Sequence, residues 1–163
     1  MDQGYSISAD AFGNAFVTGS FQNLTIYFGS NIVYNNGGPC FHGCTDAFLV
    51  KYDANGNVLW AKDAGGIADD EGYCVSTDPS GEVYLTGGFN SSGGIFYGTL
   101  TPILSWPYNA LDPMFFIKCD ANGNLLCAAA LASGGDDLNG VSADLFGNAY
   151  VTGDYFLLVS NVS

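Results

Sequence analysis

Two phrases of this sequence recur in the same order, about 68 residues apart. The first, GYSISADAFGNAFVTG at 4–19, returns as GYCVSTDPSGEVYLTG at 72–87 and in shortened form as GVSADLFGNAYVTG at 140–153. The second, DAFLVKYDANGNVLWA at 46–61, returns as PMFFIKCDANGNLLCA at 113–128. A fixed period of this length is typical of repeat proteins, in which each unit buries its faces against its neighbours. We therefore expect repeats at 1–71 and 72–138, a partial third repeat at 139–163, and a longer array of which this chain is a segment.

Each full repeat predicts four β-strands and no helix. In the first repeat the strands are expected at 4–10, 14–19, 46–53 and 57–66. The first alternates polar and apolar residues with a period of two, as a half-buried strand does. The DAFGN and DANGN segments that follow the first and third strands have the Asp and Gly of tight hairpin turns. The second and third strands are apolar on both faces, which predicts a sheet lying between two other sheets.

This pattern favours one all-β architecture over its alternatives. A sandwich would not repeat its sequence, and a solenoid with one strand per coil would have a shorter period. Consecutive antiparallel strands in tandem four-stranded units, buried on both faces, are typical of β-propeller blades. The sequence thus predicts two full propeller blades and part of a third.

The two phrases also resemble a known family. The succession D-x-x-G-N-x-Y-V-T-G, D-A-F-L-V-K-Y-D-x-N-G-N-x-L-W-A-K and a Gly-Gly pair is similar to the SBBP, or seven-bladed β-propeller, repeat of secreted bacterial proteins. The resemblance implies a large extracellular or cell-surface protein, in Bacteroidetes-type bacteria often with a C-terminal sorting domain for type IX secretion. It implies a scaffold and supplies no catalytic residues. Cys127 departs from the pattern, because the first copy has Trp60 there.

The charge balance excludes some partners. The chain has 16 acidic residues against 3 basic ones, for a formal net charge of −13, and none of the basic residues is Arg. Nucleic acids and anionic membrane surfaces are bound mainly through Lys and Arg, so neither is expected as a partner. No apolar run is long enough to span a membrane. The acidity is consistent with a soluble extracellular protein.

The five cysteines do not follow the repeat. Three of them, Cys74, Cys119 and Cys127, replace Ser, Tyr and Trp of the first copy, which is typical of thiols that pack as small apolar groups. Cys40 and Cys44 lie in the glycine-rich segment GGPCFHGC, where a local disulfide and a pair of free thiols are both compatible with the spacing.

Ligand binding is expected at one end of the blades. The short turns fall on one end, whereas the long connections at 20–45 and 89–112 and the links between blades fall on the other. Variable loops on a rigid scaffold commonly carry binding residues. Phe41, Trp106 and Tyr108 are the candidate contacts for a protein or glycan, because aromatic side chains stack on sugars and anchor interfaces. The YFGS and FYGT segments within these connections have another interpretation, as an extra strand at the blade edge.

Carboxylates suggest a possible calcium site. Asp69 and Asp70 in one link between blades, and Asp136 and Asp137 in the next, could bind Ca²⁺ together or form a solvated acidic rim. The DANGN segments resemble the start of a calcium loop but lack its later Glu, and an ordinary turn requires the same residues. No other cofactor is expected.

Enzymatic motifs are nearly absent. His42 is the only histidine, and with Cys40 and Cys44 it lacks the spacing of a zinc site. We therefore expect a non-enzymatic extracellular propeller that binds a protein or glycan ligand, or the remaining blades of its own propeller. The alternatives are a structural part of a surface appendage or stalk and, third, a glycan hydrolase with a carboxylate pair that the sequence does not identify.

Overall fold

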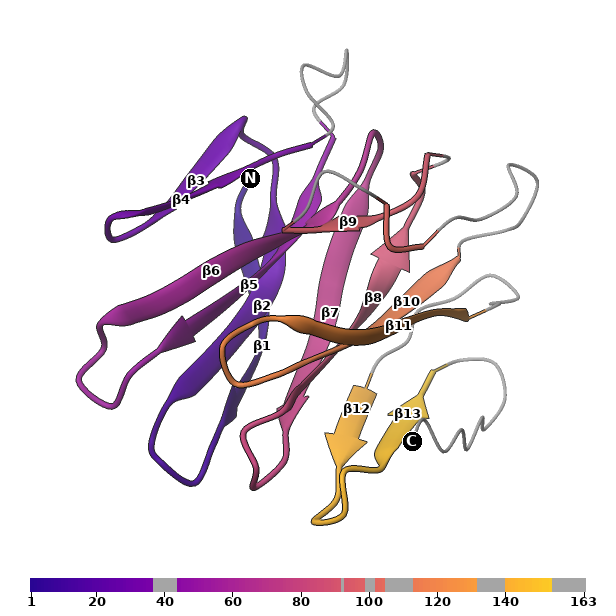
Figure 1. The fold of residues 1–163 in the computed structure, drawn as a ribbon. Coiled ribbons are helices and arrows are strands. Elements are labelled where there is room, and N and C mark those ends of the chain that lie inside the picture. Colours follow the sequence, from indigo (N-terminus) through magenta and orange to yellow (C-terminus); the bar gives the residue numbers. More distant parts are fainter. Residues whose placement is uncertain (37–43, 92, 99–101, 105–112, 132–139, 154–163) are drawn as a thin grey trace.

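The computed structural model describes residues 1–36, 44–91, 93–98, 102–104, 113–131 and 140–153. Every regular element in these ranges is a β-strand, and all the pairings between strands are antiparallel (Figure 1). The prediction of an all-β fold is confirmed. The described part of the chain contains no helix with the length and apolarity needed to cross a membrane.

The two full repeats form two four-stranded sheets of the same topology. Sheet 1 contains β1 (Gln3–Ala9), β2 (Ala15–Phe21), β5 (Asp46–Tyr52) and β6 (Val58–Gly65) in that spatial order. Sheet 2 contains β7 (Asp70–Thr77), β8 (Val83–Phe89), β10 (Met114–Cys119) and β11 (Leu125–Leu131) in the corresponding order. Sheet 3 pairs β12 (Gly140–Ala143) with β13 (Ala149–Thr152). The four predicted strands of each full repeat are therefore present, in the predicted order.

Short turns connect β1 to β2 and β5 to β6, and the same turns recur in the later sheets. In the first, the Gly13 amide donates to the Asp10 carbonyl at 3.2 Å, and the Asp10 amide donates to the Asn14 carbonyl at 3.0 Å. Gly13 has a φ of 81°, and the glycines at the same place in the other four turns have φ between 78° and 84°. Glycine adopts this left-handed conformation without steric cost, which explains why each turn has one.

The apolar core lies mainly between sheets 1 and 2. Alternate residues of sheet 1, among them Phe16 and Leu49, pack against Leu85, Phe115 and Ile117 of sheet 2. A second cluster joins sheet 2 to sheet 3. Six of the seven residues of β5 are buried, as expected for a strand covered on both faces. Sheets 1, 2 and 3 are thus stacked face to face, with sheet 2 in the middle.

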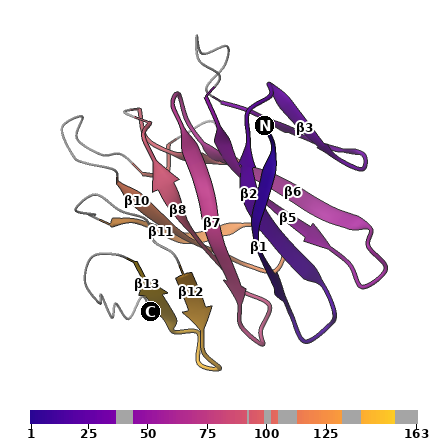
Figure 2. The same ribbon diagram turned by 180° about the vertical axis from the view of Figure 1, so that it is seen from behind.

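The first strands of the three sheets, β1, β7 and β12, lie side by side (Figure 2). Serine and threonine hydroxyls connect them. The Ser6 hydroxyl accepts the Val75 amide at 3.2 Å, and the Ser76 hydroxyl accepts the Ala143 amide at 3.1 Å. The three sheets therefore converge along their first strands. This convergence is the arrangement expected of propeller blades.

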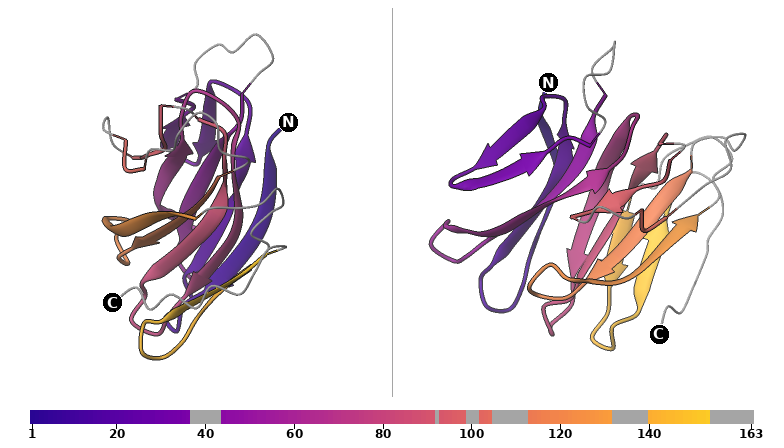
Figure 3. Two further views of the ribbon diagram at one scale, coloured as in Figure 1. Left: turned by 90° about the vertical axis from the view of Figure 1, so that its right-hand side faces the viewer. Right: turned by 45° about the horizontal axis from the view of Figure 1, so that its top comes forward.

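Extra strands occur where the YFGS and FYGT segments suggested them. β3 (Thr25–Phe28) and β4 (Asn31–Tyr34) form a hairpin that packs on the face of sheet 1 turned away from sheet 2 (Figure 3). β9 (Phe96–Tyr97) lies within the connection of sheet 2, yet it pairs with β6 and becomes the fifth strand of sheet 1. The second repeat therefore completes the edge of the first.

Candidate functional site

A group of carboxylates lies at the junction of sheets 1 and 2, near the long connections. Asp46 begins β5 and Asp70 begins β7, and both residues have no exposed surface. Asp70 accepts the Gly66 amide at 2.7 Å, the Ser91 hydroxyl at 2.7 Å and the Asn90 amide at 3.2 Å. These bonds join the link between the sheets to the connection that follows β8. We call Asp46, Asp63 and Asp70 the junction carboxylates.

Glycines leave room for these buried acids. A Cβ atom on Gly65 would lie 2.2 Å from the Asp46 carboxyl carbon, and one on Gly66 would lie 2.6 Å from the Ser91 side chain. Asp46 accepts the Asn36 amide at 2.6 Å through Oδ2, whereas its Oδ1 is buried without a hydrogen-bond partner. The Asn36 side chain donates a short hydrogen bond to Asp63. The Gly-Gly pair of the repeat thus has a packing role.

Burial controls the titration of the junction carboxylates. Desolvation, reinforced by the nearby Asp63 charge, raises the pKa of Asp46 to about 7. Desolvation likewise raises the pKa of Asp70 to about 8, and the Asp46 charge acts in the same direction. The pKa of Asp63 is also raised, again chiefly by desolvation. Because a buried charged carboxylate is unfavourable, both Asp46 and Asp70 are largely protonated below about pH 6.

Asp69, a predicted calcium ligand and the neighbour of Asp70, contacts the segment that precedes β5. Its Oδ1 accepts the Thr45 amide at 3.0 Å, and Asp70 donates its own amide to the Thr45 carbonyl at 2.7 Å. Within the described ranges no group of three or more His, Cys, Asp or Glu side chains is arranged to hold a metal ion. Asp136 and Asp137 lie outside the described residues. The calcium site therefore stays a prediction.

The opposite end of the sheets carries the short turns, in which the aspartate carboxylates accept hydrogen bonds from their own turns. In the DANGN turn of sheet 1, Asp53 Oδ1 accepts the Asn55 and Asn57 amides, and Oδ2 accepts the Asn57 side chain at 2.9 Å. The same three bonds form around Asp120 and Asp144. The turn interpretation thus accounts for the contacts of Asp53 and Asp120 in the DANGN segments and of Asp144 in the DLFGN segment.

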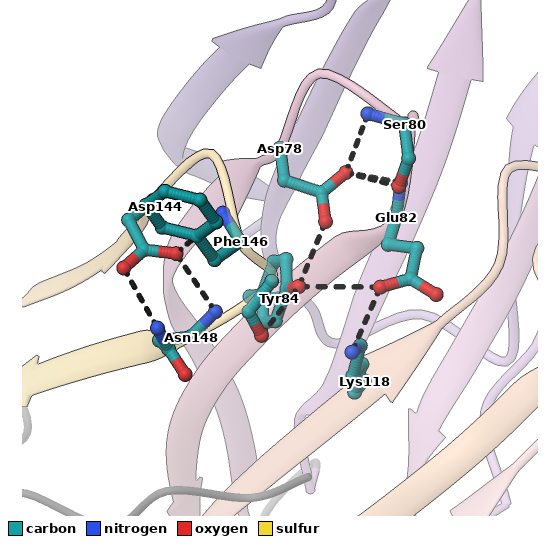
Figure 4. Close-up of polar contacts among 9 residues, drawn as sticks. Asp78, Ser80, Glu82, Tyr84, Lys118, Asp144, Phe146 and Asn148 are labelled. Atoms are coloured by element: carbon teal, nitrogen blue, oxygen red, sulfur yellow. Dashed lines mark hydrogen bonds and ion pairs between the residues drawn. The ribbon is translucent and has the colours of Figure 1, made fainter.

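One turn of sheet 2 is built differently and connects two sheets (Figure 4). The hydroxyl of the buried Tyr84 lies 2.9 Å from Asp78 Oδ2, 3.3 Å from Glu82 Oε2 and 3.1 Å from the Gly147 carbonyl of sheet 3. Lys118 forms an ion pair with Glu82 at 2.8 Å and lies over the Tyr84 ring. Sheet 1 has Phe16 in place of Tyr84, with Lys51 above its ring. This network fixes sheet 3 against sheet 2.

Replacing Tyr84 with phenylalanine is expected to lower the free energy of unfolding by about 1–2 kcal/mol, because the hydroxyl that lies between Asp78 and the Gly147 carbonyl is lost and these acceptors lose its hydrogen bond. Urea denaturation followed by tyrosine and tryptophan fluorescence measures the change. Tyr150→Phe is the matched control, since Tyr150 has the same place in the third repeat but is half exposed. An equal loss in both variants would contradict a special role for Tyr84.

The aromatic residues predicted to contact a ligand are not described. Phe41, Trp106 and Tyr108 lie outside the described residues, as do Cys40 and His42. Cys44 is described and is disulfide-bonded, whereas Cys74, Cys119 and Cys127 are free. The free state of these three agrees with the packing role that the sequence indicated for them.

Sequence reasoning missed Asp46 and Asp63. Asp46 begins the second repeated phrase and Asp63 lies in the strand expected at 57–66, so the sequence assigns both residues to the scaffold. A signal was nevertheless present, because the second repeat has Pro113 in place of Asp46 and Ala130 in place of Asp63. A charged residue at a repeat position whose other copy is apolar indicates an environment particular to one unit.

Comparison with known proteins supports a repeat scaffold. No family model matches the chain. An uncharacterized WD repeat-containing protein of Acanthamoeba polyphaga mimivirus is 26% identical over 174 residues, which cover 95% of this chain. The match spans 12% of that protein's length. Together with the repeated four-stranded sheets, this similarity indicates a β-propeller-like repeat scaffold.

Proposed function

We propose that this chain is part of a β-propeller of the SBBP type that binds a protein or glycan ligand at the end of the blades carrying the long connections. The proposal rests on the difference between the two ends of the blades. At one end, short Asp–Gly turns repeat and their carboxylates are satisfied internally. At the other, the connections differ between repeats and carry the aromatic residues that the repeat pattern does not explain.

A binding role accounts for the described chemistry better than catalysis does. Asp46 and Asp70 have raised pKa values, but neither has exposed surface on which a dissolved substrate could be protonated. Their hydrogen bonds connect sheet 1 to sheet 2. The carboxylates of the turns are held by the amides of their own turns. A general acid needs to reach its substrate, so these groups support a scaffold.

Export from a bacterial cell is the setting that we propose for this scaffold. The disulfide at Cys44 supports an oxidising compartment, in which such bonds persist. The net charge of −13 supports solubility outside the cell. Alkylation of the unreduced, denatured protein isolated from its source tests the idea, since labelling of Cys44 as a free thiol would contradict it.

Glycan-array binding by the full chain tests the ligand proposal. We expect binding to at least one glycan class and a loss of about tenfold or more in affinity for Trp106→Ala, since truncating an aromatic anchor commonly costs more than 1 kcal/mol. Phe12→Ala is the control, because Phe12 is exposed in a short turn at the opposite end. No binding to glycans or to candidate protein ligands would favour a purely structural role, and turnover of a polysaccharide would favour the hydrolase.

A further inference from the structure

The two inserted hairpins of sheets 1 and 2 are equivalent in detail. Ile26-Tyr27-Phe28-Gly29 matches Ile95-Phe96-Tyr97-Gly98, and the two glycines have φ of 60° and 54°. In the first hairpin Ile26 pairs with Val33, and in the second Ile95 forms an isolated bridge with Leu104. Each hairpin packs on the same face of its own sheet. The two hairpins therefore occupy one position of the repeat.

The second hairpin uses its outer edge to join the preceding sheet. Tyr97 pairs with Ala64 and Phe96 with Gly65 in β6, and the Gly98 amide donates to the Asp63 carbonyl at 3.2 Å. Beneath this edge, Phe89, Phe115 and Ile117 of sheet 2 pack against Phe16, Leu49 and Ala64 of sheet 1. The edge strand and the apolar face beneath it form one interface.

The first hairpin presents the same half of this interface. Phe21, Phe48 and Val50 occupy the repeat positions of Phe89, Phe115 and Ile117, and Phe28 packs on Phe48 with ring centroids 5.0 Å apart. Within the described ranges the only strand paired with β3 is β4. The Tyr27 side chain is 67% exposed, whereas its counterpart Phe96 in the paired hairpin is half-buried.

The backbone of β3 is oriented for a second partner. The Asn35 amide donates to the Leu24 carbonyl, and hydrogen-bonded pairs alternate along an antiparallel ladder. Leu24, Ile26 and Phe28 therefore direct their amides and carbonyls to β4. Tyr27 and Gly29 direct theirs to the open edge, as Phe96 and Gly98 do toward β6. An exposed edge of this kind is a template for strand addition.

The space around Gly4 in β1 also differs from the space around its counterpart in sheet 2. A Cβ on Gly72 would lie 2.2 Å from the Thr18 hydroxyl of the preceding sheet, whereas a Cβ on Gly4, at the same repeat position, would meet only Val17 at 3.9 Å. Gly4 thus has open space beside it, whereas the equivalent space beside Gly72 is filled by sheet 1.

We propose that a further four-stranded sheet of this repeat, joined ahead of β1, docks on sheet 1. It packs on the apolar face of sheet 1 beneath β3. Its outermost strand pairs with the open edge of β3, as β6 pairs with β9. The identity of this docked sheet is inferred from the interface between sheets 1 and 2. The parts of that interface that sheet 2 contributes, the hairpin edge and the apolar residues beneath it, have counterparts in sheet 1. The inference rests on the propeller scaffold proposed above and not on its ligand, so a silent glycan array leaves it standing.

An extended chain tests the proposal. A second copy of residues 2–69 is placed directly before Asp2, so that its Asp69 precedes Asp2 as Asp69 precedes Asp70 here. Amide hydrogen exchange is measured by NMR in the original and extended chains. We expect the Tyr27 and Gly29 amides to exchange at least about tenfold more slowly in the extended chain, as amides in a closed ladder do.

Two matched substitutions identify the edge that is used. Tyr27→Pro removes the outward donor of β3, and Ile32→Pro removes an outward donor of β4, while neither removes a bond between β3 and β4. The protection of Gly29 should disappear with Tyr27→Pro and persist with Ile32→Pro. Slow exchange at Ile26 reports that the hairpin itself is still formed. Gly4→Ala should leave the original chain unchanged and lower the denaturation midpoint of the extended chain.

Three results would overturn the proposal. The first is a folded extended chain in which Tyr27 and Gly29 still exchange as fast as in the original. The second is an added unit that stays unfolded, because complementary surfaces should support its folding. The third is protection of Tyr27 in the original chain that rises with protein concentration, which would assign the edge to a second copy of the chain.

Discussion

Replacing Gly72 with alanine is expected to lower the free energy of unfolding by about 3 kcal/mol, as overpacking in a close-packed interior does. The new methyl group would lie 2.2 Å from Thr18 Oγ1 and 3.4 Å from the Ala47 side chain. Thr18 has no room to yield, because it is fully buried and its hydroxyl donates to the Phe48 carbonyl at 2.7 Å. The clash therefore separates sheet 1 from sheet 2.

Guanidinium denaturation of the full chain measures this loss. Gly4→Ala is the control at the same repeat position, where the added methyl meets only one atom at 3.9 Å. Its effect should stay within about 0.5 kcal/mol of zero, as for a surface substitution. Equal midpoints for the original chain and Gly72→Ala would show that the two sheets do not approach as closely as described.

The stability of the protein is expected to fall as the pH rises from about 5 to 8.5, where the raised pKa values of the junction carboxylates lie. The pKa of Asp46 is raised to about 7 and that of Asp70 to about 8. In this window the folded protein retains protons that the unfolded chain, with a carboxyl pKa of 3.8, has already released. The stability that Asp46 and Asp70 contribute is thus fully present below their pKa in the unfolded chain. It is lost as the pH rises through their pKa values in the folded protein.

The loss should be several kcal/mol for the pair, since one pKa unit corresponds to about 1.4 kcal/mol. Below about pH 4 an opposite effect begins, because hydrogen bonds from the turn lower the pKa of Asp53, Asp120 and Asp144. These groups lose their contribution as they become protonated. Thermal unfolding recorded by circular dichroism should therefore show its highest midpoint at pH 4–5.

Substitutions distinguish the effect of the junction carboxylates on stability from that of the turn aspartates. Asp46→Asn resembles the protonated acid and should reduce the decline in midpoint between pH 5 and 8.5, whereas Asp53→Asn should leave that slope unchanged. A midpoint that rises steadily from pH 5 to 8.5 in the original chain would contradict the burial of Asp46 and Asp70.

The regular part of the fold follows from local sequence. The apolar runs and the Asp–Gly turns specify strands and hairpins within one repeat, and β1, β2, β5 and β6 form accordingly. The prediction from the alternation in 4–10 is wrong in one respect, because the apolar Tyr5 and Ile7 of β1 are exposed and the serines between and after them are half-buried. The turn contacts of the DANGN aspartates were also predictable, because a tight turn requires Asp, Asn and Gly at these places. These features depend on contacts between residues close in the chain.

Features that depend on contacts between repeats were not predictable in the same way. FYGT indicates a strand, but its addition to β6 of the other sheet depends on how sheets 1 and 2 stack. Asp46 belongs to an apolar phrase, and its burial beside Asp70 arises only when the link between sheets folds over Gly65 and Gly66. The predicted contacts Phe41, Trp106 and Tyr108 lie outside the described residues.

Two copies of one four-stranded unit stack so that a strand of the second completes the edge of the first. Nuclear Overhauser contacts between backbone protons test it most directly. We predict cross-strand contacts that place Phe96 opposite Gly65 and Tyr97 opposite Ala64, together with the strand orders β1-β2-β5-β6 and β7-β8-β10-β11. Contacts that pair Phe96 and Tyr97 with β8, β10 or β11 of their own sheet would show that β9 does not complete sheet 1.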